Sequence, residues 1–207
     1  MPRREPKLQT MVRERQRLRA TVAAWLVVAL WAPYAALNTL FPGPTLTYTF
    51  GLLIAAFSLG VLLLAGESRQ TLSLRLVLPS RFGLVILLAM LVFIPGALLA
   101  GRGQPFSALD DLVYAPASAF GQELFFRGAL LAAFARLFAG RPRLAVVAQA
   151  ALFALWHLRA FWVVAPLLAL GALLLTFVAG LLWGAQVSRD RTILWSFAEH
   201  ALFLMVQ

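Results

Sequence analysis

Three long stretches of this sequence contain no charged residue, and they constrain the fold more than any other feature. They cover residues 20–66, 82–101 and 160–188. A helix that spans a bilayer needs roughly 20 apolar residues, so the first stretch is long enough for two spans and each of the others for one. Only 13% of the residues are charged and 62% are hydrophobic, whereas soluble domains carry about 25% charged residues. The sequence therefore predicts an all-α, polytopic membrane bundle.

Helix-breaking residues and short polar loops divide the chain into about seven predicted spans. The Phe-Pro-Gly-Pro turn at residues 41–44 ends the first span, because prolines and a glycine together interrupt a helix. The predicted spans are residues 21–41, 46–65, 82–100, 109–127 with a helical continuation to about 138, 144–158, 161–186 and 192–206. We divide the chain into a basic, helical arm (1–20), three generic spans (21–106) and a membrane core that contains the polar residues (107–207).

Basic residues are concentrated on one side of the predicted spans. The net charge is +10, and 15 of the 18 lysines and arginines fall in residues 1–20, 67–81, 136–143 and 189–191. The loops on the other side hold only two, Arg102 and Arg159. This bias is typical of a membrane protein whose N-terminus is cytoplasmic, and it argues against nucleic acid as the partner. We expect the arm to contact anionic membrane lipid. The sequence has no cysteine, which excludes disulfides and thiolate chemistry.

Ionisable residues inside the predicted spans are few and gather in the second half of the chain. A charge within a span costs about 2.5–3.5 kcal/mol on insertion scales, so it usually faces a partner or a cavity. Glu123 and Arg127 are four residues apart, share one helix face and are expected to pair. This pair could be structural, or the arginine could orient a catalytic carboxylate. Asp110 and Asp111 stand where a helix begins, and we interpret them as capping residues.

Both histidines of the chain lie in the same half. Phe153 precedes His157 by four residues, so its ring is expected beside the imidazole, where it would limit access of water. His200 follows Glu199 near the middle of the last predicted span. Two histidines and a glutamate from three helices could hold a water for general-base attack, and they could also bind zinc. We assign no chemistry to the tryptophans and tyrosines, which suit interfacial belts or packing.

The order and spacing of these residues resemble the CAAX-protease and bacteriocin-processing family of intramembrane proteases. That family carries Glu-Glu-x-x-x-Arg, then Phe-x-x-x-His, then His-x-x-x-Asn. The corresponding segments here are Gln122-Glu123-Leu124-Phe125-Phe126-Arg127, Phe153-Ala154-Leu155-Trp156-His157 and His200-Ala201-Leu202-Phe203-Leu204. The resemblance covers about residues 107–207. It implies an endopeptidase of the bacterial cytoplasmic membrane that acts on a peptide or a membrane protein.

The resemblance also implies which residues form the site. In the family, the first glutamate and the two histidines prepare the attacking water, the asparagine helps to hold the oxyanion, and the arginine and second glutamate support the site. The candidate catalytic residues here are Glu123, His157, His200, Arg127 and Gln122, to which we add Glu199 as the neighbour of His200. No obligatory cofactor is expected. If the site holds zinc, then His157, His200 and Glu123 are the candidate ligands.

Two positions depart from the family pattern. Gln122 replaces the first glutamate, and an amide can bind water but cannot accept its proton. Leu204 replaces the asparagine, and the loss of one oxyanion donor typically costs about 10²–10³ in rate. Three explanations compete: Glu123 acts as the base in a shifted register, Glu199 replaces the missing carboxylate, or the protein is a pseudoprotease that binds peptides without cleaving them. A proton-coupled transporter is a further alternative, but it would be expected to show internal symmetry.

The predicted topology leaves one geometric problem. His157 falls near the outer end of its span, whereas Arg127 falls near the inner end of another. A shared site therefore requires short, tilted or re-entrant helices. Pro116 and Gly121 could provide a bend that brings the two residues together.

Overall fold

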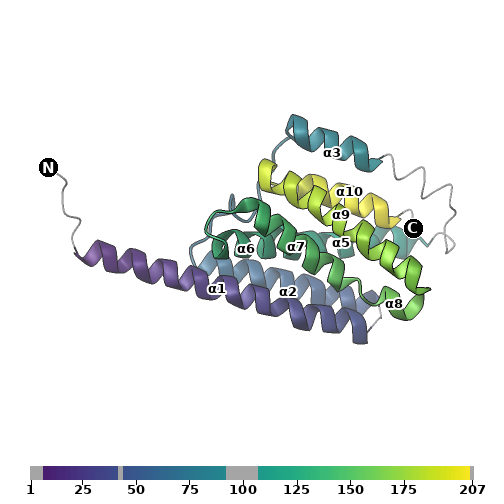
Figure 1. Cartoon of the computed structure of the whole chain (residues 1–207), viewed down its shortest axis with the longest axis horizontal. Coiled ribbons are helices and arrows are strands. Elements are labelled where there is room, and N and C mark those ends of the chain that lie inside the picture. Colours follow the sequence, from purple (N-terminus) through teal and green to yellow (C-terminus); the bar gives the residue numbers. More distant parts are fainter. Residues whose placement is uncertain (1–6, 42–43, 92–106, 206–207) are drawn as a thin grey trace.

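The chain folds into a bundle of helices, as its apolar stretches predict (Figure 1). The computed structural model describes residues 7–41, 44–91 and 107–205. Within these residues the only β-type pairing is an isolated bridge between Leu74 and Thr192. The predicted all-α fold is therefore confirmed. The helices are α1 (Lys7–Leu40), α2 (Pro44–Leu64), α3 (Arg81–Leu91), η1 (Asp110–Tyr114), α5 (Ala115–Glu123), η2 (Leu124–Leu130), α6 (Leu131–Leu137), α7 (Pro142–Trp156), α8 (Ala160–Val163), α9 (Pro166–Asp190) and α10 (Leu194–Met205).

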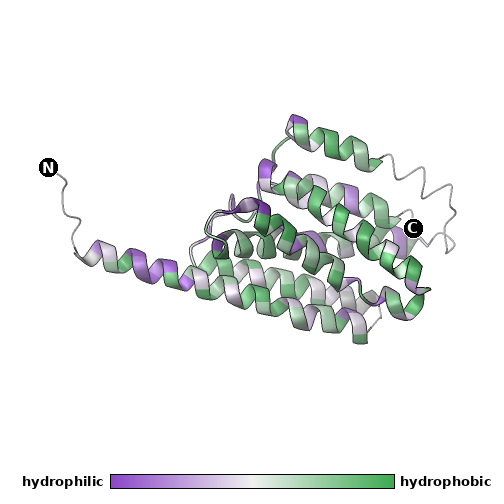
Figure 2. Ribbon diagram, in the orientation of Figure 1, coloured by the Kyte–Doolittle hydropathy of each residue, from purple (hydrophilic) through white to green (hydrophobic). Residues whose placement is uncertain are grey.

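The described part of the basic arm and the first predicted span form one continuous helix. α1 runs from Lys7 to Leu40, so the predicted boundary at residue 20 marks a change of surroundings and not of secondary structure. Figure 1 shows the N-terminal part of α1 projecting beyond the bundle, and Figure 2 shows hydrophilic residues concentrated in that part. From Ala20 onward one face of the helix is buried, including Ala24 and Val27.

A single helical path of alternating π- and α-helical segments carries the first motif. η1 and η2 are π-helical, and α5 and α6 continue them without a break. Helical structure therefore extends through predicted span 109–127 and almost to the predicted end at residue 138. π-Helical turns are rare and occur frequently at functional sites. Here η2 starts directly after Glu123 and contains Arg127.

Two glycines of this path allow α2 to approach closely. A Cβ atom on Gly121 would lie 3.4 Å from the backbone nitrogen of Leu52, and one on Gly128 would lie 3.4 Å from the side chain of Leu59. Gly121, from which a bend was expected, thus serves as a packing position. Pro116 lies in the first turn of α5, where proline is tolerated, and the helical path continues through it.

Two predicted spans differ from the helices that form, and a third is described only in part. Predicted span 161–186 is divided: α8 ends at Val163 and α9 begins at Pro166, because proline suits the first turn of a helix and cannot donate within one. α9 then continues to Asp190. Predicted span 144–158 ends early, at Trp156, which leaves His157 as the residue that caps α7. Residues 92–100 of predicted span 82–100 lie outside the described residues.

Small residues bring α7 and α9 together beside the polar residues. A Cβ atom on Gly180 would lie 3.1 Å from Cα of Ala150, and one on Gly184 would lie 2.8 Å from Oε1 of Gln149. Glycines at this spacing of four are typical of closely packed helix pairs in membranes. Trp183 lies between the two glycines, and its ring is 6.4 Å from the ring of Phe153 on α7.

Contacts between the basic segments place them at one end of the bundle. Arg136 at the end of α6 pairs with Glu67 after α2, and the backbone nitrogen of Ile193 donates to the carbonyl of Ser73 over 3.0 Å. The charge bias predicts this arrangement. Gln9–Leu40, Pro142–Val163 and Pro166–Asp190 are each long and apolar enough to cross a membrane, and Tyr48–Leu64 and Arg81–Leu91 are shorter apolar helices. The protein is therefore an integral membrane bundle.

Candidate active site

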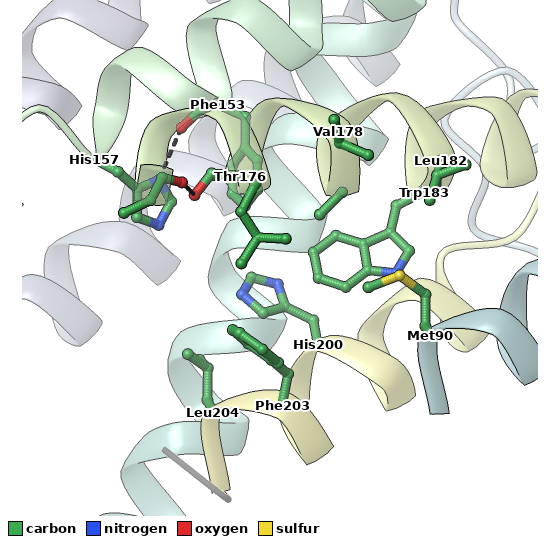
Figure 3. Close-up of a pocket in the computed structure, with 13 residues that line it drawn as sticks. Met90, Phe153, His157, Thr176, Val178, Leu182, Trp183, His200, Phe203 and Leu204 are labelled. Carbon is green, nitrogen blue, oxygen red and sulfur yellow. Dashed lines mark hydrogen bonds between the residues drawn. The ribbon is translucent and has the colours of Figure 1, made fainter. Parts of the chain in front are cut away.

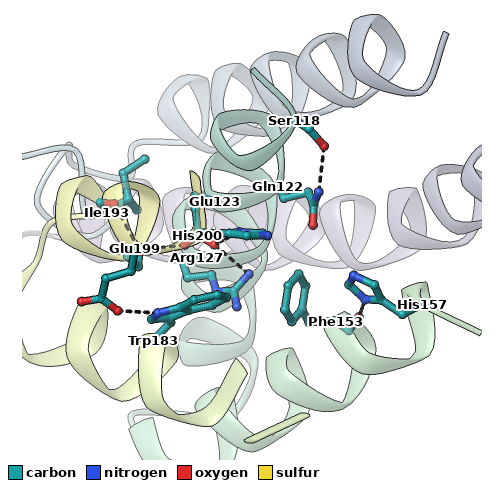
Figure 4. A network of polar contacts seen from close by, with 11 residues as sticks. Ser118, Gln122, Glu123, Arg127, Phe153, His157, Trp183, Ile193, Glu199 and His200 are labelled. Carbon is teal, nitrogen blue, oxygen red and sulfur yellow. Dashed lines mark hydrogen bonds and ion pairs between the residues drawn. The ribbon is translucent and has the colours of Figure 1, made fainter. Parts of the chain in front are cut away.

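His200 and Glu123 form the centre of a buried polar cluster (Figure 4). His200 Nδ1 lies 2.9 Å from Glu123 Oε1, and Ser196 Oγ donates to Glu123 Oε2 over 2.7 Å. Ser196 and His200 are four residues apart and therefore share one face of α10. Glu123, at the end of α5, is fully buried, and His200 is 3% exposed. α10 thus delivers one donor to each oxygen of a single carboxylate.

Arg127 supplies the positive charge of this cluster. Its Nη1 is 3.1 Å from Glu123 Oε1, so the ion pair predicted from the spacing of four is confirmed. None of the three guanidinium nitrogens has an aligned hydrogen-bond acceptor, and the attraction is therefore mainly coulombic. The flat group lies over the ring of Phe153, with Cζ 3.9 Å from the ring centroid. The arginine is fully buried and contributes charge and packing to the site.

The partners of the two histidines define where their protons lie. His157 Nδ1 is 2.9 Å from the backbone carbonyl of Phe153, which can only accept, so this nitrogen carries a proton. His200 Nδ1 faces the Glu123 carboxylate, whose ionised form also only accepts. In both neutral imidazoles Nε2 is then the unprotonated nitrogen. The site therefore holds two imidazole groups with a free lone pair each.

A cavity of about 320 Å³ adjoins both imidazoles (Figure 3). It is bounded by α3, α7, α9 and α10, and most of its lining is apolar. The lining residues that have polar side-chain atoms are His157, His200, Thr176 and Trp183. A cavity that combines an apolar wall with a few polar groups is the usual form of a binding site for an apolar chain.

The predicted topology separates His157 from Arg127, and Phe153 lies between them in the structure, in contact with both. Its ring centroid is 5.0 Å from that of His157 and 5.9 Å from that of His200, and it also supports Arg127. α7 is short, so His157 at its end remains next to the cluster. The predicted contact between Phe153 and His157 is confirmed, and the structure brings His157, His200, Glu123 and Arg127 into one site.

The two positions that depart from the family pattern both lie at this site. Gln122 Nε2 donates to Ser118 Oγ over 3.0 Å, and its Oε1 is buried without a hydrogen-bond partner. In Figure 4 the Gln122 amide points toward Phe153 and the two histidines. Leu204, one turn after His200, lines the cavity. An unpaired acceptor and an apolar side chain thus stand where the family has a carboxylate and an amide.

Glu199 is buried but faces away from this cluster. Its Oε2 accepts a hydrogen bond from Trp183 Nε1 over 2.6 Å, and its Oε1 accepts one from Gln186 Nε2 over 3.4 Å. The Trp183 ring in turn stacks on His200, with centroids 4.8 Å apart and planes inclined by 24°. Glu199 therefore touches the site only through Trp183.

Asp110 and Asp111 lie at the start of η1, away from the cluster. The backbone nitrogen of Ser107 donates to Asp111 Oδ2 over 2.8 Å, and the backbone nitrogen of Asp110 donates to Ser107 Oγ over 3.3 Å. This reciprocal arrangement is that of a capping box. The interpretation as a capping residue is confirmed for Asp111, whose carboxylate accepts from Ser107, whereas Asp110 takes part through its backbone N–H.

Comparison with protein families explains why these residues occur together. Residues 104–206 match the family model of type II CAAX prenyl endopeptidase Rce1-like proteins. The chain belongs to this family. All the candidate site residues of this Rce1-like protein lie inside the matched segment, whereas α1, α2 and α3 lie outside it. No curated protein and no solved structure matches the chain. The family consists of endopeptidases, so membership supports a peptide or protein as the substrate.

The histidines and carboxylates of this Rce1-like protein do not converge as metal ligands. Within the described residues, no three His, Asp or Glu side chains are grouped so that they could hold a metal ion. Glu123, a candidate zinc ligand, already contacts Ser196, His200 and Arg127. Only Nε2 of His157 and Nε2 of His200 remain, whereas catalytic zinc takes three protein ligands. Zinc binding by His157, His200 and Glu123 therefore stays a prediction from the sequence.

Sequence reasoning missed Ser196, Trp183 and Ser118 in this Rce1-like site. Ser196 precedes His200 by four residues, and this spacing on a predicted helix was a usable signal. Trp183 is 17 positions before His200 and on another helix, so nothing in the sequence pairs them. Ser118 precedes Gln122 by four residues, but it matters only because the Gln122 amide points back along α5.

Proposed function

We propose that this protein hydrolyses peptide bonds within the membrane, with His200 as the proton acceptor and Glu123 as the group that orients it. The 2.9 Å contact between His200 Nδ1 and Glu123 Oε1, beside a cavity that His200 lines, carries this proposal. A carboxylate that accepts from Nδ1–H fixes the tautomer of a histidine and stabilises the imidazolium that forms. Proton transfer then does not depend on Gln122.

The reaction consumes one water for each peptide bond. His200 Nε2 takes a proton from the water as its oxygen attacks the scissile carbonyl carbon, which gives a tetrahedral oxyanion. The oxyanion then re-forms the carbonyl, and the carbon–nitrogen bond breaks. The imidazolium of His200 returns its proton to the leaving nitrogen, so the products are a carboxylic acid and an amine and His200 is neutral again.

Gln122 and His157 are suited to hold this water without removing its proton. Gln122 Oε1 is a buried acceptor with no partner, and His157 keeps its Nδ1 proton on the Phe153 carbonyl. The water can donate one hydrogen to His200 Nε2 and the other to Gln122 Oε1 or His157 Nε2. Its lone pair is then directed at the carbonyl carbon, which is the orientation that attack requires.

The cavity suggests the kind of substrate. Its lining is largely apolar, and α3, α9 and α10 expose apolar side chains such as Val85, Leu174 and Leu202 to the lipid. We propose an apolar segment of a peptide or membrane protein as the substrate, and the bacterial cytoplasmic membrane as the location. The mechanism uses side chains alone, and we expect no cofactor.

Leu204 favours a second candidate function. It lines the cavity one turn after His200 and has no polar atom with which to stabilise an oxyanion. A pseudoprotease, which binds an apolar peptide in the cavity without cleaving it, would tolerate this change. Such a protein would act as a membrane binding or immunity protein.

A peptidase assay with matched variants separates the two functions. The full chain, purified in detergent, is incubated with quenched fluorescent peptides that contain apolar segments, and products are identified by mass spectrometry. We expect slow cleavage that His200→Ala lowers by about 10²–10⁴, the usual contribution of a general base. EDTA should leave the rate unchanged, and so should Glu14→Gln, which alters an exposed glutamate of α1. If wild type binds the peptides and cleaves none of them, the protein is a pseudoprotease.

A further inference from the structure

A second cluster of charged side chains lies at the basic end of the bundle, away from the proposed active site. A hollow of about 390 Å³ is lined by four arginines from two helices, Arg13, Arg17, Arg19 and Arg136. The first three belong to α1 and the last to α6. Among the described residues that line the hollow, none is acidic.

The packing face of α1 directs two of these arginines toward the hollow. Ala20, Ala24 and Val27 lie on the face of α1 that is buried in the bundle. Arg13 and Arg17 precede Ala20 by seven and three residues, so they continue that face where the helix projects beyond the bundle. The arginines therefore point at the ends of α2 and α6.

The end of α2 forms the other wall and fixes Arg136. Gly66, with φ of +96°, is the left-handed residue that ends α2. The nitrogen of Gly66 donates to the carbonyl of Leu63 over 3.0 Å, and that of Glu67 donates to Leu62 over 2.9 Å, as in a Schellman motif. This turn brings Glu67 to Arg136, with Arg136 Nε donating to Oε1 over 2.9 Å.

An anion would lower the free energy of this arrangement. Charges of like sign within a Debye length of about 10 Å repel one another at ordinary salt. Glu67 pairs with Arg136, and Arg17 and Arg19 add two further positive charges to the same hollow. Guanidinium groups bind phosphate in a bidentate manner. The rim also carries Leu64, whose side chain is 91% exposed. An apolar rim beside cationic groups suits a ligand that has both a phosphate and a hydrocarbon part.

We propose that this hollow binds the phosphate headgroup of an anionic membrane phospholipid. The charge bias of the chain predicts that this end faces the cytoplasm, where basic pockets between transmembrane helices bind anionic headgroups. The headgroup phosphate lies among the arginines, and the glycerol and acyl chains extend past Leu64 along α2. Binding would hold the projecting part of α1 at the membrane surface. This site does not depend on the proposed peptidase activity.

Native mass spectrometry of the full chain tests this site. The purified protein, in a neutral detergent, is titrated with phosphatidylglycerol and, separately, with phosphatidylcholine. The test variant is Arg17→Gln/Arg19→Gln. The matched control is Arg15→Gln/Arg141→Gln, which removes the same charge at the same end from residues that do not line the hollow. We expect wild type to retain one phosphatidylglycerol, the test variant to bind it at least tenfold more weakly, and the control to bind within twofold of wild type.

Several results would contradict the proposal that this hollow binds a phospholipid headgroup. Equal losses in the two variants would mean that the lipid responds to overall charge and not to the hollow. Equal retention of phosphatidylcholine would remove the requirement for an anion. Displacement of the bound lipid by millimolar inorganic phosphate would identify a site for free anions. Should the double variant fail to fold, the exposed single variant Arg17→Gln gives the same comparison against Arg15→Gln.

Discussion

Two buried glutamates lie near His200, one across the bundle and one beside it in sequence, and their surroundings differ. Glu123 is in contact with a guanidinium, a hydroxyl and the imidazole of His200 itself. Glu199 accepts only from an indole and an amide, and both of these donors are neutral. A carboxylate keeps its charge in a buried site when cations and several donors surround it. The residues around Glu123 therefore stabilise a negatively charged carboxylate next to His200. Glu199, in contrast, mainly fixes the position of the Trp183 indole.

Residues that are adjacent in the sequence of a helix need not have side chains that contact each other, as Glu199 and His200 show. Glu199 is bonded to His200 along the chain, but successive residues of a helix point in different directions. Its side chain consequently turns toward α9. Glu123 is 77 residues from His200 in sequence and yet touches it. This contact is the reason why we propose Glu123 as the orienting carboxylate, and we propose that Glu199 supports Trp183.

The largest expected effect comes from exchanging the two carboxylates for amides. In Glu123→Gln a single carbonyl oxygen cannot accept from both His200 Nδ1–H and Ser196 Oγ, and the negative charge that attracts Arg127 is lost. We therefore expect kcat to fall by about 10⁴, as for an orienting carboxylate of a catalytic histidine. In Glu199→Gln the carbonyl still accepts from Trp183, and we expect kcat within about tenfold of wild type, the loss of one hydrogen bond at most.

Rates are measured with peptides that wild type cleaves, and both variants are checked for an unchanged helical spectrum. If kcat falls as much in Glu199→Gln as in Glu123→Gln, then Glu199 takes part in the reaction and the distinction between the two glutamates is wrong.

Restoring the missing donor has the next largest expected effect. Leu204 lines the cavity one turn after His200, so Leu204→Asn would place an amide N–H beside the scissile carbonyl. We expect a rise in kcat of about 10²–10³, the usual value of one oxyanion donor. Leu202→Asn is the matched control, because Leu202 lies on the same helix and is 40% exposed on its outer side.

No gain in Leu204→Asn, with cleavage by wild type established, would mean that the carbonyl does not lie near this position. The cluster around Glu123 would then act on a substrate placed differently in the cavity.

The fold was predictable from the sequence because a backbone in lipid must satisfy its own hydrogen bonds, and a helix does so. Uncharged stretches of sufficient length had to be helices, and the clustering of arginines correctly placed the basic loops together at one end. The limits of the helices were less predictable. Pro166 divides one predicted span and Trp156 ends another early. Such details depend on local capping, which competes with hydrophobicity at each helix end.

The site was predictable where its residues share a helix and not where they meet across helices. The Glu123–Arg127 pair and the Phe153–His157 contact both follow from a spacing of four. The contact between His200 and Glu123 joins α10 to α5 and follows from no spacing. The direction of Glu199 likewise depends on where α9 packs, which is determined by Gly180 and Gly184.

The smallest expected effect tests how Glu199 acts. Trp183→Phe keeps an aromatic face against His200 but removes the indole N–H that Glu199 accepts over 2.6 Å. A single hydrogen bond contributes about 1 kcal/mol, so we expect kcat to fall about fivefold with KM unchanged. Trp162→Phe is the control, since Trp162 is 70% exposed on α8.

Histidine NMR separates positioning from a general loss of folding. The chain has only two histidines, so selective labelling gives one set of imidazole signals for each, and His157→Gln assigns them. We expect Trp183→Phe to shift the His200 signals and to leave those of His157 in place, because His157 is held by the Phe153 carbonyl. Equal shifts at both histidines would show that the change spreads through the bundle. Unchanged His200 signals would show that Glu199 does not influence His200 through Trp183. Glu123 would then be the one carboxylate that positions His200.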